Sequence, residues 1–218
     1  MVKGYIFDLD GVLVDTAKYH YDSWRQLANS LGFDITLEQN EELKGVSRME
    51  SLEFILNIGG KSMSTREKMK LAALKNKWYV DKIASMDASE LLPGTKELLE
   101  DIQKCNGKIA LGSASKNSVK ILKATGIYKY FEVIIDGNKT TESKPHPQVF
   151  LMGAKALGLE PRECIVFEDS KKGVEAANTG GFISIGIGDD QSLADADYNL
   201  KNLKDVKVDR LMKLINPL

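Results

Sequence analysis

Apolar residues recur at helical spacing over residues 15–88, where the pattern predicts four helices. The first is expected over residues 17–31 and the second over roughly 37–43. Ser47-Arg48-Met49-Glu50 and Ser64-Thr65-Arg66-Glu67 each have the form of a capping box, in which a serine side chain and a glutamate three residues later satisfy the first backbone groups of a helix. The pattern therefore predicts an all-helical unit here.

From residue 92 onward, short apolar runs alternate with helical segments. Strands are expected at 108–112, 131–135, 164–167, 182–187 and 198–200. Helices are expected over 95–105, 113–126 and 143–157. A further helix is expected to end at 177, and a last one to begin at 204. This alternation is typical of a parallel sheet with helices on both faces.

Tyr5 to Phe7 has the character of the later strands, so the helical unit is interpreted as an insertion. The predicted fold is α/β, with a Rossmann-like parallel sheet core and an inserted all-α helical cap domain. The core is expected to comprise residues 1–14 and 89–218, and the cap residues 15–88. The two chain crossings between these units are expected to act as a hinge.

Composition narrows the function classes. The chain has 218 residues, 43% of them hydrophobic, and 30 basic against 31 acidic residues give a net charge of -1. A net charge so close to zero gives the protein no overall positive potential that would attract nucleic acid or an anionic membrane. Cys105 and Cys164 are too few and too far apart for a disulfide framework, and no apolar run approaches the roughly 18 residues that span a bilayer. We expect a soluble, cytoplasmic protein.

Two carboxylates follow the first strand. In an extended chain residues i and i+2 point the same way, so Asp8 and Asp10 share a face, and Gly11 permits a sharp exit. Such a pair alone is often only a turn or a helix cap. However, ligands of parallel sheets bind beyond the carboxyl ends of the strands, and polar groups follow several strands of this chain.

Three further stretches carry groups suited to phosphate and a cation. Ser113 and Ala114 offer a hydroxyl and a backbone N–H at a predicted helix entrance, where an anion is favoured, and Lys144 adds positive charge. Asp8, Glu168 and Asp169 supply the hard oxygen ligands that suit Mg²⁺. Together these groups indicate a phosphoryl-transfer site.

These motifs resemble the four motifs of the haloacid dehalogenase superfamily, in the expected order over the whole chain: Asp8-Leu9-Asp10-Gly11-Val12, Ser113, Lys144-Pro145 and Glu168-Asp169. Within that superfamily the chain resembles the β-phosphoglucomutase family. The more selective signs are the loop Lys44-Gly45-Val46-Ser47-Arg48 and the run Ser113-Ala114-Ser115-Lys116-Asn117.

The resemblance implies interconversion of β-D-glucose 1-phosphate and β-D-glucose 6-phosphate through an aspartyl phosphate and β-glucose 1,6-bisphosphate. It makes Asp8 the nucleophile and Asp10 the general acid and base. It places Mg²⁺ on the Asp8 carboxylate, the Asp10 carbonyl and Asp169, with Glu168 in support. Ser113, the Ala114 N–H and Lys144 would bind the transferring phosphoryl group.

The cap is expected to contribute the sugar site and a second phosphate site. Arg48, in the first turn of a capped helix, is the candidate clamp for the phosphate that is not reacting. By resemblance, Ser115, Lys116 and Asn117 approach the same phosphate from the core, His20 and Lys75 couple cap closure to Asp10, and the sugar pocket is lined by Trp24, Lys44, Gly45, Val46, Ser47 and Ser51.

Two alternatives stay open at this point. One is a phosphatase of the same superfamily, which would share Asp8 but use water as acceptor. The other is a catalytically idle binding module, although every charged motif residue is present. A small sugar phosphate is the expected partner, with no nucleic acid or membrane, and the expected state is a monomer. His146 has no expected role beyond helix entry.

Overall fold

The computed structural model describes residues 2–189 and 191–215, so residues 190 and 216–218 of the predicted core range, and Met1, lie outside the described residues. Within them, six strands form one parallel sheet in the order β3-β2-β1-β4-β5-β6. The strands are β1 (Gly4–Phe7), β2 (Lys108–Gly112), β3 (Val133–Ile135), β4 (Cys164–Glu168), β5 (Ile183–Ile187) and β6 (Tyr198–Leu200). The predicted Rossmann-like sheet is confirmed.

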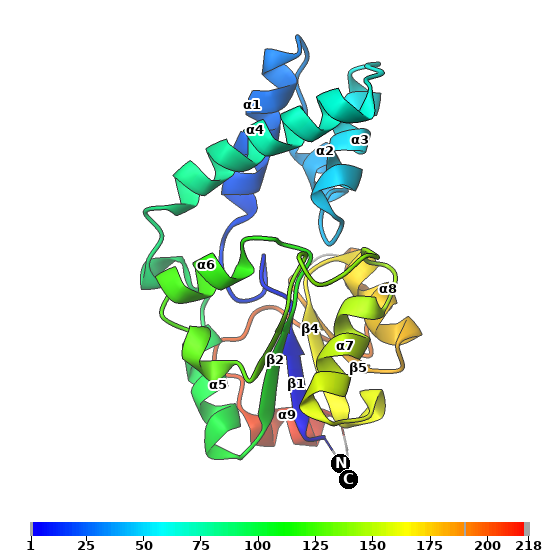
Figure 1. Cartoon of the computed structure of the whole chain (residues 1–218). Helices are drawn as coiled ribbons and strands as arrows, with labels where there is room; N and C mark the ends of the chain where they lie inside the picture. The colour runs from blue at the N-terminus through cyan, green and yellow to red at the C-terminus, as the bar shows by residue number, and fades with distance from the viewer. Residues whose placement is uncertain (1, 190, 216–218) are drawn as a thin grey trace.

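Helices cover both faces of this sheet, as the alternation predicted (Figure 1). The helices that pack on the sheet are α5 (Thr95–Lys104), α6 (Ser118–Ala124), α7 (Gln148–Leu157), α8 (Lys171–Thr179) and α9 (Val208–Ile215). Short 3-10 turns lie at Ala88–Glu90, Tyr128–Tyr130, Pro161–Glu163 and Gln191–Leu193. Strand β1 is buried on both faces because Ile6 packs with apolar residues of α7 and α8, whereas Tyr5 and Phe7 pack with those of α5, α6 and α9.

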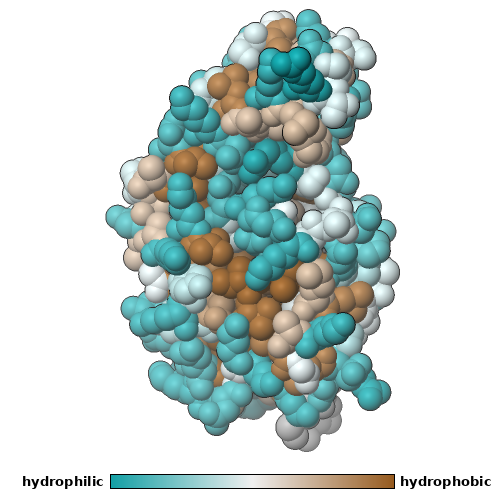
Figure 2. Space-filling model, in the orientation of Figure 1, coloured by the Kyte–Doolittle hydropathy of each residue, from teal (hydrophilic) through white to brown (hydrophobic). Residues whose placement is uncertain are grey.

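Four helices between β1 and α5 form a separate helical unit above the sheet in Figure 1: α1 (Ala17–Ser30), α2 (Leu37–Glu41), α3 (Arg48–Ile58) and α4 (Thr65–Ile83). Both predicted capping boxes are present, since Ser47 and Ser64 accept from the N–H of Glu50 and Glu67. The unit has its own apolar core around Trp24, Leu27 and Ile55. In Figure 2 its visible face is mainly hydrophilic, and apolar side chains gather lower down, on the core.

The apolar residues of α4 are only partly buried. Met69 is 62% exposed and Ala73 is also exposed, whereas Lys75 is buried. The helical period predicts a stripe, but which edge of the stripe meets the core depends on how α4 packs against α1 and α3.

Three helix starts also differ from the prediction. Helix α7 begins at Gln148, five residues after the expected start at Ser143. The segment after β2 stays a loop until α6 begins at Ser118, because the Ser113 and Ser115 hydroxyls accept backbone N–H groups and hold local turns. The last helix begins at Val208, not Lys204. Asp205 adopts a φ of 58°, a left-handed conformation that interrupts the helix.

The two chain crossings between the helical unit and the core lie side by side. Val14 forms an antiparallel bridge with Leu91, and the N–H of Asp15 donates to the carbonyl of Glu90 at 3.0 Å. None of the helices that can be described is both long and apolar enough to cross a membrane.

Candidate active site

The candidate site lies at the carboxyl ends of β1 and β4, where the strand order reverses. Asp8 directly follows β1, and its N–H donates to the carbonyl of Phe167 in β4. Glu168 is the last residue of β4, and Asp169 follows it. Because neighbouring parallel strands end at the same edge, the carboxylates of two distant sequence segments meet here.

Lys144 joins two of these carboxylates. Its Nζ lies 2.6 Å from Oδ1 of Asp8 and 2.7 Å from Oε2 of Glu168, and the lysine is 2% exposed. Burial alone would lower the pKa of Lys144, but the Asp8 and Glu168 carboxylates beside it raise that pKa. Lys144 therefore stays protonated and supplies a fixed positive charge next to Asp8.

Three carboxylates can hold a metal ion. Asp8, Glu168 and Asp169 each offer an oxygen, and these atoms all lie within 4.8 Å of one another. Burial raises the pKa of Asp169 to about 7 and raises that of Asp8 well above its usual value, and the neighbouring Glu168 carboxylate adds to both shifts. An all-oxygen donor set of this kind fits a hard divalent cation such as Mg²⁺.

Gly11 keeps the backbone close to this cluster. Its φ is +80°, and a Cβ there would collide with the Asp169 carboxylate. The predicted sharp exit after Asp10 is therefore present. It serves the acidic cluster as well as the turn.

Asp10 belongs to a different set of contacts, and its carboxylate is not part of the acidic cluster. Its Oδ1 accepts a hydrogen bond from the Thr16 hydroxyl and lies 3.8 Å from Nε2 of His20. Thr16 directly precedes α1, but its hydroxyl donates to Asp10 and does not cap the helix. Burial raises the pKa of Asp10, while the Thr16 hydrogen bond opposes this. A carboxyl with a raised pKa is suited to proton transfer.

Lys75 extends this chain of contacts. Its Nζ lies 3.1 Å from Nδ1 of His20 and packs over the rings of Trp24 and Tyr79. Burial, followed by the charge of Arg48, lowers the pKa of Lys75 to about 7. Burial, followed by the charges of Lys75 and Arg48, also holds the pKa of His20 well below its usual value. When Lys75 is protonated it can only donate, so the neutral imidazole carries its proton on Nε2, toward Asp10.

The loop after β2 forms another wall. Ser113 is fully buried, and its Oγ accepts from the Ser115 N–H at 3.1 Å. The expectation that Ser113 and Ala114 stand at a helix entrance is wrong, since α6 begins later and is only seven residues long. Asn117 reaches across to the helical unit, where its Nδ2 donates to Oδ1 of Asn76 at 3.0 Å.

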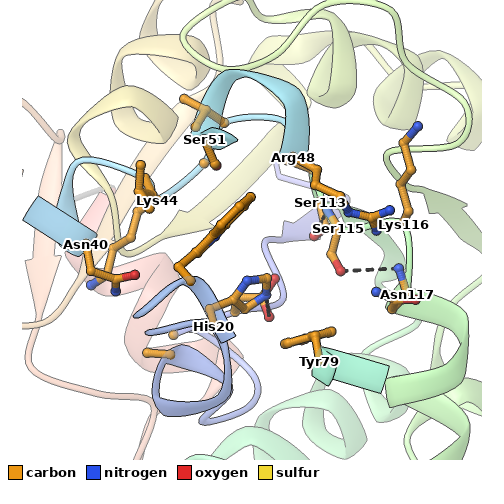
Figure 3. A pocket seen from close by; sticks show the side chains of 18 of the residues that line it. His20, Asn40, Lys44, Arg48, Ser51, Tyr79, Ser113, Ser115, Lys116 and Asn117 are labelled. Atoms are coloured by element: carbon orange, nitrogen blue, oxygen red, sulfur yellow. Dashed lines mark hydrogen bonds and ion pairs between the residues drawn. The ribbon is translucent and has the colours of Figure 1, made fainter. Parts of the chain in front are cut away.

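One cavity collects most of the predicted residues from both units (Figure 3). Its lining includes Asp8, Asp10, His20, Trp24, Lys44, Gly45, Val46, Arg48, Ser51, Lys75, Ser113, Ala114, Ser115, Lys116, Asn117 and Asp169. Three predicted residues do not line it. Lys144 donates to Asp8 and to Glu168, and all three side chains are buried. The Ser47 N–H donates to the Ser143 hydroxyl at 3.1 Å.

The sequence patterns missed five residues of the cavity wall: Ala17, Asn40, Leu43, Asn76 and Tyr79. Asn76 and Tyr79 could have been predicted from the sequence, because they lie one and four residues after Lys75 on α4. Asn40 carried no signal. His146 is exposed, and its Nδ1 accepts from the Gln148 N–H at the start of α7, which agrees with a helix-entry role.

Known proteins resemble this chain over nearly its full length. A family model described as haloacid dehalogenase-like hydrolase matches residues 5–187. The β-phosphoglucomutase of Bacillus subtilis (strain 168) is 37% identical over 212 residues, covering 96% of this chain and 94% of that protein. The phosphorylated carbohydrates phosphatase of Thermotoga maritima is 31% identical over 185 residues, covering 83% and 82%. The crystal structure of a Clostridium difficile β-phosphoglucomutase has a TM-score of 0.95 at 42% identity, covering 98% and 97%.

Proposed function

The chain belongs to the haloacid dehalogenase-like hydrolase family, and from this premise we propose that it is a β-phosphoglucomutase. It is then an isomerase that interconverts β-D-glucose 1-phosphate and β-D-glucose 6-phosphate through an aspartyl phosphate and β-glucose 1,6-bisphosphate. The similarity of this chain to β-phosphoglucomutases from two organisms supports the substrate class.

The observation that carries the proposal is the position of Arg48, which lines the same cavity as Asp8 and can bind a second phosphate. Arg48 lines that cavity together with Ser115, Lys116 and Asn117, and within the described residues it forms no ion pair with an acid. Figure 3 shows Arg48 beside Ser115 and Lys116. A mutase needs such a group because its bisphosphate carries one phosphate that is not reacting. A guanidinium is suited to bind it with two hydrogen bonds.

In the first half of the reaction, phosphorylated Asp8 donates its phosphoryl group to the 6-hydroxyl of β-glucose 1-phosphate. The bond from the Asp8 oxygen to phosphorus breaks, the bond from the sugar oxygen to phosphorus forms, and Asp10 accepts the hydroxyl proton. Lys144 stabilises the carboxylate that Asp8 regains, since its Nζ lies 2.6 Å away.

In the second half, the bisphosphate is bound in the opposite orientation. The Asp8 carboxylate attacks the phosphorus at C1, and Asp10 returns its proton to the leaving sugar oxygen, which yields glucose 6-phosphate and phosphorylated Asp8. Arg48 holds the other phosphate in each half. The proton that Asp10 gains and loses balances across the two halves.

Asp8, Glu168 and Asp169, with the Asp10 carbonyl, would hold Mg²⁺, which would neutralise charge on the transferring phosphoryl group. The cap side chains Lys44, Trp24 and Val46 would exclude water from Asp8, so that the sugar hydroxyl is the acceptor. We also propose that the protein acts as a monomer.

The test follows two products at once. The protein is incubated with Mg²⁺, β-glucose 1-phosphate and a trace of the 1,6-bisphosphate, and glucose 6-phosphate and free phosphate are both measured. Glucose 6-phosphate should dominate. Asp8→Asn should lower turnover by at least about 10⁴-fold, whereas the exposed neighbour Asp15→Asn should keep it. Dominant release of free phosphate would contradict the mutase.

A phosphatase acting on a small phosphorylated carbohydrate is the second candidate. The similarity to the Thermotoga maritima phosphatase favours it, because the Asp8 chemistry would be the same with water as acceptor. The product ratio in the same assay separates the two.

A further inference from the structure

Helix α2 is built with its polar and apolar residues in unexpected places. It has five residues, and Asn40 is the buried one, at 6% exposed, while Leu37 is 65% exposed. Burial of apolar surface drives folding, so a helix placed by packing alone would bury the leucine and expose the amide. Something other than the stability of the helical unit accounts for Asn40.

The amide oxygen of Asn40 is buried without a hydrogen bond. Its Oδ1 has no partner among the described residues, although most buried polar atoms in folded proteins have one. Leaving such an atom unpaired destabilises the folded protein. The backbone of Asn40 is satisfied, since its N–H donates to the Thr36 carbonyl at 3.1 Å. The unpaired group is therefore the side chain alone.

Asn40 lines the same cavity as Asp8 and Asp10. In Figure 3 its oxygen points toward the interior of the pocket, and it lies beside Lys44, across the view from Arg48 and Lys116. A carbonyl oxygen accepts hydrogen bonds and repels an anion, so its natural ligand group is a hydroxyl and not a phosphate. Apolar side chains of Trp24 and Leu43 line the same cavity, as in sites that bind the C–H faces of sugars.

We infer that Asn40 is a specificity-determining residue whose Oδ1 accepts a hydrogen bond from one hydroxyl group of the bound carbohydrate. The inference rests on the proposed function for the carbohydrate nature of the ligand. Its consequence is selectivity, because an analogue that lacks this hydroxyl leaves the Asn40 oxygen unpaired in a closed cavity. Such an analogue should react about tenfold less well, the loss expected for one neutral hydrogen bond.

The test combines substrate and protein changes in one cycle. The value of kcat/KM is measured for β-glucose 1-phosphate and its 2-, 3- and 4-deoxy analogues with the wild type, Asn40→Leu and Asn57→Leu. Asn57 is an exposed asparagine of α3 and serves as the matched control. In the wild type and the control, one analogue should lose about tenfold more than the other two. In Asn40→Leu that extra loss should vanish.

A second readout separates recognition from a role in folding. Asn40→Leu removes an unpaired buried oxygen, so its Tm without ligand should equal or exceed that of the wild type. The rise in Tm caused by glucose 1-phosphate should be smaller than in the wild type. A lower Tm in Asn40→Leu combined with an unchanged analogue pattern would overturn the inference.

The failure of this inference can be told from the failure of the proposed function. Binding of the analogues is also followed by the ligand-induced shift in Tm, which needs no turnover. If the wild type binds sugar phosphates but releases only free phosphate, the proposed mutase activity is wrong. The role of Asn40 is then tested by the binding of the deoxy analogues alone. Equal binding of all three deoxy analogues to the wild type would overturn the Asn40 inference whatever the variant does.

Discussion

The Nζ atom of Lys44, on the helical unit, lies 3.1 Å from Oδ2 of Asp169, on the core. The same lysine pairs with Glu41 at 2.7 Å. Asp169 is also one of the three carboxylates that can hold a metal ion. This ion pair therefore connects the helical unit to the acidic cluster of the core.

Removing this ion pair should favour an open arrangement of the two units. Lys44→Met loses a partly buried pair worth about 1 kcal/mol, so the ratio of open to closed molecules should rise by up to about fivefold. Small-angle X-ray scattering in EDTA should show a larger radius of gyration. Lys68→Met is the control, because the partner of Lys68, Glu53, lies on the same unit. Equal radii for the wild type and Lys44→Met would contradict the prediction.

Arg48→Ala should separate mutase activity from simple hydrolysis. Losing a charged contact to the second phosphate costs about 1.5–3 kcal/mol, so kcat/KM for β-glucose 1-phosphate should fall about 10- to 100-fold. Hydrolysis of p-nitrophenyl phosphate, which has a single phosphate, should fall much less. Arg66→Ala removes the matching first-turn arginine of α4, which is exposed, and should change neither activity. Equal losses in both assays for Arg48→Ala would remove the case for a phosphate clamp.

Lys75 should make the stability of the protein depend on pH. Its pKa falls from 10.5 to about 7 on burial, so between these values the unfolded chain holds a proton that the folded chain lacks. The free energy of unfolding therefore rises with pH in this window, by up to about 1.4 kcal/mol per pH unit from this residue. The full cost is present below pH 7 and is lost above 10.5.

Lys75→Met should consequently be more stable than the wild type at pH 7, and the difference should shrink as the pH approaches 10. Urea unfolding at pH 7, 8, 9 and 10 measures this. Lys77 is an exposed lysine on the same helix, so the free energy of unfolding of Lys77→Met should depend on pH in the same way as that of the wild type. A constant gap between Lys75→Met and the wild type would show that Lys75 does not titrate in this range.

Gly11→Ala should damage the acidic cluster beyond the cost of backbone strain. Gly11 and Gly32 have similar positive φ values, +80° and +89°, so alanine should strain both by about 1 kcal/mol. Only at Gly11 would the new Cβ collide with Asp169, since nothing lies within 4 Å of a Cβ at Gly32. Thermal unfolding with and without Mg²⁺ should show a stabilising shift in Gly32→Ala and little in Gly11→Ala. Equal shifts would mean that Asp169 does not contribute to cation binding.

Much of the fold could be predicted because its signals are local. The capping boxes at Ser47 and Ser64 involve residues three positions apart, and both form in the structure. Strand Lys108–Gly112 matches the prediction to the residue. The start of α6 was missed because the Ser113 and Ser115 hydroxyls compete with the helix for the same N–H groups, a choice that the apolar pattern does not record.

The amino-acid sequence alone determined that Asp8 and Asp10 follow a strand, that a helical unit interrupts an α/β chain, and that Arg48 opens a capped helix. These features depend on neighbours two to four residues apart. Three other features became visible only in the folded protein: Lys75 is buried against His20, Lys44 contacts Asp169, and the Asn40 side-chain oxygen lines the cavity without a partner. The reason is physical, because burial and charge pairing depend on which surfaces pack together, and packing joins residues that are far apart in the chain.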